Sequence, residues 1–129
     1  MVRRTLPMQD IESLIGETPM PVALARTGQP RRVPAVIGSS AYRVVRDALA
    51  AARAATAASV AIEFMPGALA VEVVDDGGGT RDLEEIIELA AALGGGLNAA
   101  PADGGFRVRA WLPTEGQPPY PAVPRATLG

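Results

Sequence analysis

Apolar residues recur at helical spacing in two segments of the chain. The first set follows Ser39 and Ser40, either of which can cap a helix. Its members are Ala41, Val44, Val45, Ala48, Leu49 and Ala52. The second set follows Thr80, a further capping residue. Its members are Leu83, Ile86, Ile87 and Ala90. These patterns predict amphipathic helices from Ser39 or Ser40 to Thr56, and from Thr80 to Gly94, where glycine ends the second helix.

Shorter segments alternate apolar and polar positions, as strands do. Residues 60–64 and 69–73 flank a Pro-Gly turn and predict one β-hairpin, and residues 97–99 and 106–112 flank a Gly-rich turn and predict another. In the final segment, alternate residues share an apolar face. They are Phe106, Val108, Ala110 and Leu112.

The first 40 residues contain five prolines, which interrupt long regular elements. There we expect a short helix over residues 8–14, a strand over 21–26 and a second short strand over 31–33. The resulting order of elements predicts an α/β fold of the two-layer sandwich type. Its sheet is expected to be mixed but mostly antiparallel, with helices on one face.

Proline content and periodicity also divide the chain. We expect the sandwich to occupy residues 21–113, behind an N-terminal segment of residues 1–20. Residues 114–129 are rich in proline and lack periodicity, so we expect a disordered tail.

The amino-acid composition excludes several classes of function. The chain has 129 residues, no Cys, no His and a formal net charge of -2. It therefore has no thiol nucleophile and no imidazole that could act as a base or accept a phosphoryl group. It lacks the clustered positive charge of nucleic-acid-binding proteins, and no apolar run approaches the roughly 20 residues of a membrane-spanning helix. We expect a cytoplasmic protein that neither binds nucleic acid nor inserts into membranes.

Asp75 begins a Gly-rich segment at the end of a predicted strand. A carboxylate in that position can accept a hydrogen bond from an exocyclic amine such as that of adenine. Glycines at 77 and 79 would let the backbone approach a flat ring or a phosphate. The alternative is a polar, Gly-rich loop without a ligand.

Three parts of the sequence together carry a resemblance to a known family. They are residues 41–49 (AYRVVRDAL), residues 73–79 (VVDDGGG), and residues 91–97 (AALGGGL) with 104–110 (GGFRVRA). In this order they resemble the N box, the D-x-G-x-G box, and the closing helix and strand of one kind of domain. That domain is the ATP-binding (HATPase_c) domain of nitrate-sensor-type two-component sensor histidine kinases, in the GHKL superfamily.

The resemblance implies a Bergerat-type fold with ATP and Mg²⁺ as ligands. It implies that Asp75 binds adenine and that Gly77, Gly79 and Gly105 shape the nucleotide pocket. Asp47 stands where the family has the N-box Glu, which makes it the candidate catalytic base.

The sequence departs from the family at positions that matter for phosphate chemistry. Ala51 replaces the N-box Asn that helps to hold Mg²⁺, and a methyl group offers no oxygen ligand. Phe106 replaces a Thr of the third Gly box. Between Gly79 and Leu89 the chain passes almost directly into a helix, where the family has a lid around the triphosphate. These departures argue against ATP and Mg²⁺ binding, and no metal-binding residue is predicted.

Two functions follow from this pattern. The first is a degenerate ATP-binding-type domain that acts as a regulatory or interaction module in signal transduction, with weak or no nucleotide binding. Its partner would be a kinase, a response regulator or a second copy of the chain. The second is an ATP-dependent protein kinase domain that acts in trans, on a His or Ser of another chain, with Asp47 as the base.

Overall fold

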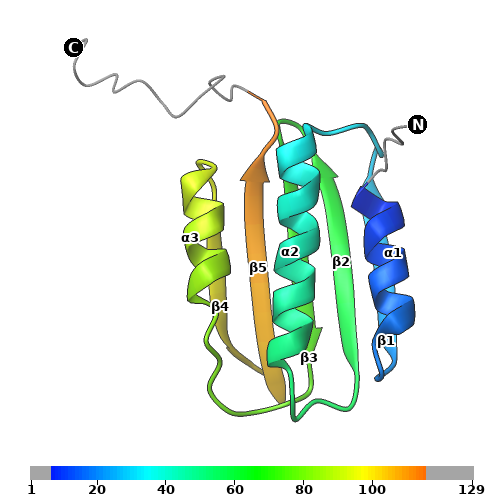
Figure 1. The fold of residues 1–129 in the computed structure, drawn as a ribbon, viewed down its shortest axis with the longest axis vertical. Coiled ribbons are helices and arrows are strands. Elements are labelled where there is room, and N and C mark those ends of the chain that lie inside the picture. Colours follow the sequence, from blue (N-terminus) through cyan, green and yellow to red (C-terminus); the bar gives the residue numbers. More distant parts are fainter. Residues whose placement is uncertain (1–6, 116–129) are drawn as a thin grey trace, which may run out of the picture.

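A computed structural model describes residues 7–115 as two layers, with helices packed in front of one sheet (Figure 1). The strands are β1 (Val22–Gly28), β2 (Ala58–Met65), β3 (Ala68–Asp75), β4 (Gly96–Ala102) and β5 (Gly105–Pro113). The helices are α1 (Pro7–Glu17), α2 (Ala35–Ala51) and α3 (Glu84–Ala92). Within these residues, no helix is long and apolar enough to cross a membrane.

The sheet has the strand order β1-β2-β3-β5-β4. β1 and β2 are parallel and are joined by a crossover that contains α2, whereas β2–β3, β3–β5 and β4–β5 are antiparallel. The two predicted hairpins are β2–β3 and β4–β5. This arrangement confirms the predicted α/β sandwich with a mixed, mostly antiparallel sheet.

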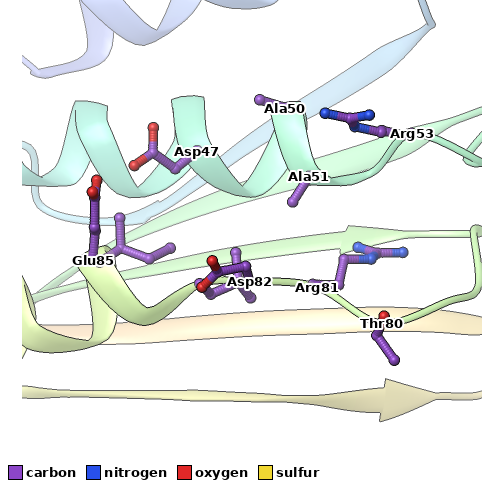
Figure 2. Close-up of a pocket in the computed structure, with 10 residues that line it drawn as sticks. Asp47, Ala50, Ala51, Arg53, Thr80, Arg81, Asp82 and Glu85 are labelled. Carbon is purple, nitrogen blue, oxygen red and sulfur yellow. The ribbon is translucent and has the colours of Figure 1, made fainter.

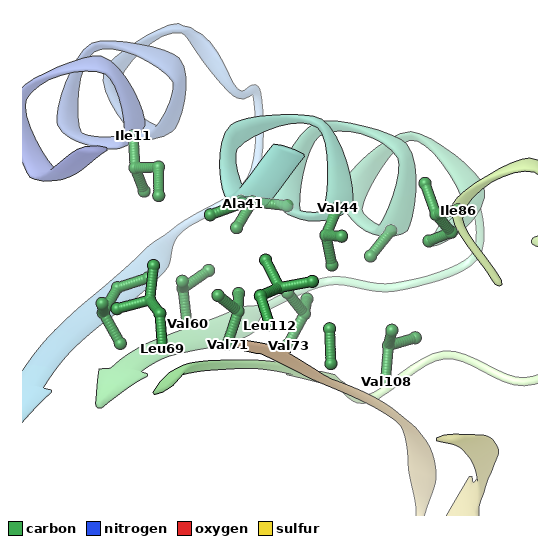
Figure 3. Packing of buried hydrophobic residues seen from close by; sticks show 14 of the residues in the cluster. Ile11, Ala41, Val44, Val60, Leu69, Val71, Val73, Ile86, Val108 and Leu112 are labelled. Carbon is green, nitrogen blue, oxygen red and sulfur yellow. The ribbon is translucent and has the colours of Figure 1, made fainter. Parts of the chain in front are cut away.

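The core lies between the helices and the face of the sheet that they cover. Figure 3 shows Ala41 and Val44 of α2 above apolar side chains of the sheet. Fully buried members from the strands include Ile62, Leu69, Val71, Val73, Val108 and Leu112. Ile11 of α1 is also fully buried in this cluster, so part of the segment that precedes residue 21 packs with the sandwich.

α2 begins four or five residues before the predicted cap. Pro34, not Ser39 or Ser40, is the N-cap, and its carbonyl oxygen accepts hydrogen bonds from Ile37 N (2.9 Å) and Gly38 N (3.0 Å). Proline suits a helix start because its fixed φ and missing N–H cost nothing there. The prediction was therefore wrong at this end, and also at the other, since the helix ends at Ala51.

α3 begins at Glu84 rather than at the predicted Thr80. The reason lies in Arg81, whose side chain is bonded to Asp75 and so holds this part of the chain out of the helix. Asp82 Oδ1 instead accepts a hydrogen bond from Glu84 N at 3.3 Å. The other end is as predicted, because Gly94 adopts φ 88° directly after the last turn.

The predicted strand over residues 31–33 does not form. Flanking prolines at 30 and 34 lack the N–H that a strand would donate. Arg31 instead turns inward, and its Nη2 donates to Met65 O (2.7 Å) and Thr114 Oγ1 (3.0 Å). Arg31 therefore ties the start of α2 to the β2–β3 turn and to the end of β5. The predicted tail lies outside the described residues from position 116 onward.

A pair of substitutions on β5 tests the two faces of the sheet. Leu112→Ala is expected to lower the free energy of unfolding by about 2–5 kcal/mol, because a fully buried leucine leaves a cavity. Arg107→Ala, at a side chain that is 58% exposed on the opposite face, should change it by less than about 0.5 kcal/mol. Urea denaturation measures both, and equal losses would contradict the assigned faces.

Candidate functional site

Asp75 ends β3 at the edge of the core. Its register partner on β5 is Phe106, and the residue is only 5% exposed. Such a buried carboxylate is costly unless its charge is paired and its oxygens are hydrogen-bonded. The surroundings of Asp75 therefore decide what this end of the sheet can bind.

Arg81 pairs with both oxygens of Asp75. Its Nη1 lies 2.7 Å from Oδ2 and its Nη2 lies 3.0 Å from Oδ1. The two side chains are 1% and 2% exposed. Gly77 N donates a third hydrogen bond to Oδ1 at 2.8 Å. The carboxylate is thus neutralised and bonded by residues that lie close to it in sequence.

The ring of Phe106 completes the enclosure of Arg81. The guanidinium carbon lies 4.4 Å from the centroid of the ring, within the range of a cation–π contact. The planar guanidinium therefore lies between a carboxylate fork and an aromatic face. We call Asp75, Gly77, Arg81 and Phe106 the Asp75 site.

The predicted glycines meet protein backbone rather than open space at two of their three positions. A Cβ at Gly105 would lie 1.8 Å from Asp75 O, and one at Gly77 would lie 2.8 Å from Ala55 N. Only glycine permits these approaches. Gly79 adopts φ +93°, and a Cβ there would have no neighbour within 4 Å, so its requirement is conformational.

A groove of about 640 Å³ runs beside the Asp75 site, between the C-terminal end of α2 and the segment leading into α3 (Figure 2). Its lining includes Asp47, Ala51, Arg53, Asp82 and Glu85. Asp47 therefore faces the groove, as the predicted base would. Asp75 is not part of the lining, whereas its ion-pair partner Arg81 is.

Charged side chains of both signs line or adjoin the groove. Carboxylates of Asp47, Asp82 and Glu85 line it together with Arg53, whereas the guanidinium of Arg81 is paired with Asp75. Asp47 pairs with Arg46 (3.0 Å) and with Arg43 (3.6 Å). Glu85 also pairs with Arg43 at 2.9 Å. Arginines therefore balance the carboxylates of Asp47 and Glu85, and the groove carries no strong net charge of either sign.

The residues present do not fit Mg²⁺ or adenine. Ala51 presents a methyl group at the expected metal position, and within residues 7–115 no cluster of three acidic side chains could hold a metal ion. The carboxylate that would bind adenine is engaged on both oxygens by Arg81 and Gly77. Recognition of adenine by Asp75 would therefore require Arg81 to move.

Asp76 fixes the loop that carries the site. Its carboxylate accepts hydrogen bonds from the Thr56 hydroxyl, from Thr56 N (2.7 Å) and from Ala57 N (3.2 Å). The Thr56 hydroxyl, followed by the Thr56 N–H, holds the pKa of Asp76 below its ordinary value of 3.8. The loop after β3 is thereby joined to the loop after α2.

The sequence pattern predicts Asp75 but misses its partner. It assigns Arg81 to a helix start, and it treats Phe106 as a replacement of a family Thr without a role of its own. The available signal is a buried Asp followed six residues later by an Arg, with an aromatic residue on the neighbouring strand.

Comparison with known proteins identifies the fold. Neither a protein-family model nor a curated protein matches the sequence significantly. Among solved structures, the blue-light activated histidine kinase of Erythrobacter litoralis EL346 is similar, with a TM-score of 0.62 and 22% identity over 86% of this chain and 40% of that chain. The histidine kinase AdeS of Acinetobacter baumannii gives 0.62 and 12% over 85% of this chain and 62% of that chain.

The histidine kinase domain of the E. coli osmosensor EnvZ is similar over most of both chains. It gives a TM-score of 0.62 and 17% identity over 91% of this chain and 89% of that chain. The chain spans less than two thirds of the first two proteins, 40% and 62%. At these identities the likeness establishes the fold, which is that of histidine kinase ATP-binding domains.

Replacing Arg81 tests how much the buried Arg81–Asp75 ion pair contributes to the stability of the fold. Arg81→Met is expected to lower the free energy of unfolding by about 3–5 kcal/mol, because it leaves Asp75 charged and buried. Arg26→Met breaks the exposed pair with Glu12, whose side chains are 52% and 49% exposed, and should cost less than about 1 kcal/mol. Chemical denaturation at neutral pH compares them; a loss in Arg81→Met as small as in the control would contradict the buried pair.

Acid should remove the contribution of Asp76. Because its folded pKa is depressed, its stabilisation is present above pH 3.8 and is lost as pH falls through the folded pKa. Asp76→Asn should therefore be less stable than wild type at about pH 6, with the difference narrowing at about pH 2.5. Thr56→Val should reproduce part of this change. A difference that is constant with pH would show that Asp76 acts without its charge.

Proposed function

We propose that this chain is a regulatory or interaction module of signal transduction, built on the histidine kinase ATP-binding fold and binding nucleotide weakly or not at all. One observation carries the proposal: Arg81 holds both oxygens of Asp75, the carboxylate on which adenine recognition would depend. Arg81 thus supplies hydrogen-bond donors to Asp75 in the place where adenine would otherwise donate.

The energy of the buried pair supports this assignment. Separating one partner from a buried ion pair costs about 3–5 kcal/mol. A cost of that size weakens an affinity by roughly 10²- to 10³-fold or more, which moves a micromolar nucleotide site into the millimolar range. The amino group of adenine is neutral, so it would not compensate for the lost charge of Arg81.

The surroundings of the site support the same conclusion. Residues 76–83 are the whole connection between β3 and α3, so the proposal includes loss of the lid that encloses the triphosphate in the family. Phosphoryl transfer depends mainly on donors and cations placed around the phosphates. Beside the groove, Arg43 and Arg46 are already paired with Asp47 and Glu85, so these cations are not free to bind a phosphate.

Without nucleotide binding, the proposed function of this domain is to bind another protein. Its proposed partner is a protein of the same signalling system, namely a kinase, a response regulator or a second copy of this chain. Trp111 is 45% exposed on the face of the sheet opposite the described helices, and an exposed aromatic side chain is a common interface residue. The proposed compartment is the cytoplasm.

Calorimetric titration with ATP and ADP, each with and without Mg²⁺, tests the proposal. We expect no binding tighter than about 1 mM for the wild-type protein. Affinity in the micromolar range that is lost in Asp75→Asn would overturn it and favour the alternative, an ATP-dependent kinase domain acting in trans. Asp47→Asn would then be the variant that tests the base.

A further inference from the structure

The Asp75 site has the form of a receptor for a guanidinium group. Two carboxylate oxygens lie 2.7 and 3.0 Å from two guanidinium nitrogens, which is the paired geometry that a fork of donors requires. Phe106 lies 4.4 Å from the central carbon. The ligand in this receptor is the chain's own Arg81, whose side chain is 1% exposed.

We propose that Asp75 and Phe106 form a binding site for an external guanidinium group, such as an arginine side chain of a partner protein, and that Arg81 occupies this site in cis until it is displaced. The proposal rests on the proposed function in one respect, that Arg81 rather than nucleotide fills the site. The inference adds two statements to the proposed function: the ligand is a guanidinium group, and Arg81 must be displaced before the ligand binds.

The chemistry of the site selects guanidinium over other groups. A lysine ammonium is a point charge and cannot engage both oxygens in parallel, nor stack its plane on Phe106. An adenine amino group is neutral and would leave the charge of a carboxylate that is 2% exposed without compensation. A second guanidinium restores the charge, the two hydrogen bonds and the aromatic contact together.

The segment that carries Arg81 is built so that the arginine can leave. Gly78 and Gly79 precede Arg81, and a Cβ at either would have no neighbour within 4 Å, so they can adopt new backbone angles at little steric cost. Arg81 is also among the residues that line the groove of about 640 Å³, and its side chain, which is 1% exposed, would enter that space by turning outward. Asp75 and Phe106 are held by contacts that do not involve Arg81, namely their pairing between β3 and β5 and the hydrogen bonds of Asp76 with Thr56.

A variant without the internal ligand makes the site measurable. Arg81→Ala is titrated with methylguanidinium, methylammonium and adenosine, each up to about 10 mM, by calorimetry and by thermal shift. We expect methylguanidinium to bind and to raise the melting temperature, with an affinity at least about tenfold above that of methylammonium. N-acetylarginine amide should bind likewise and N-acetyllysine amide should not, which extends the result to a peptide side chain.

Two controls separate the site from a general salt effect. Wild-type protein should bind methylguanidinium far more weakly, because a tethered Arg81 competes at a high effective concentration. The double variant Asp75→Asn/Arg81→Ala should lose the binding. If Arg81→Ala does not fold, refolding in methylguanidinium against methylammonium gives the same comparison, and Arg81→Gln is the second variant.

Binding of adenosine in place of methylguanidinium, or equal effects of the two cations, would overturn the guanidinium site. So would a failure of methylguanidinium to bind or refold both variants. None of these results bears on the wild-type titration with ATP, so this inference and the proposed function fail separately.

Discussion

A charged carboxylate at the end of β3 must be neutralised, and the chain around it is arranged to do so. The side chain of Arg81 reaches back to Asp75, which keeps residues 80–82 out of α3 and sets the first turn of that helix at Glu84. The same contact turns a flat cation toward Phe106. The Arg81–Asp75 ion pair thus fixes the loop after β3, the start of α3 and the position of the Arg81 guanidinium against Phe106.

Most of the fold could be predicted from local patterns. Period-two alternation in β2, β3 and β5 and the apolar stripe of α2 depend on burial, which the sequence expresses directly. The errors fell where a long-range side-chain contact overrides a local signal. Thr80 looks like a cap, yet Arg81 is drawn to Asp75; residues 31–33 look extended, yet Arg31 donates to Met65 O at 2.7 Å.

In the Asp75 site, too, the sequence predicts the local features and misses the long-range contact. Position and burial of Asp75 follow from its place at the end of an apolar strand, so the sequence was sufficient to single it out. Its partner, Arg81, could not be predicted in this way. Several charged residues are close in sequence to that strand end, and only the tertiary structure shows which one pairs with Asp75. Resemblance to nucleotide-binding proteins drew attention to the glycines, of which Gly105 in fact makes room for Asp75 O. A glycine that a motif would assign to a ligand pocket can therefore be required by packing.

The parallel pairing of β1 with β2 has a consequence for the order in which the chain acquires its structure. Its register places Val22 opposite Ala58, across the whole of α2, whereas the β2–β3 hairpin brings Met65 next to Ala68. Closing a long loop costs more chain entropy before any contact repays it. We therefore expect the hairpins to pair early and locally, and β1 to join the edge of the sheet after α2 has packed on it.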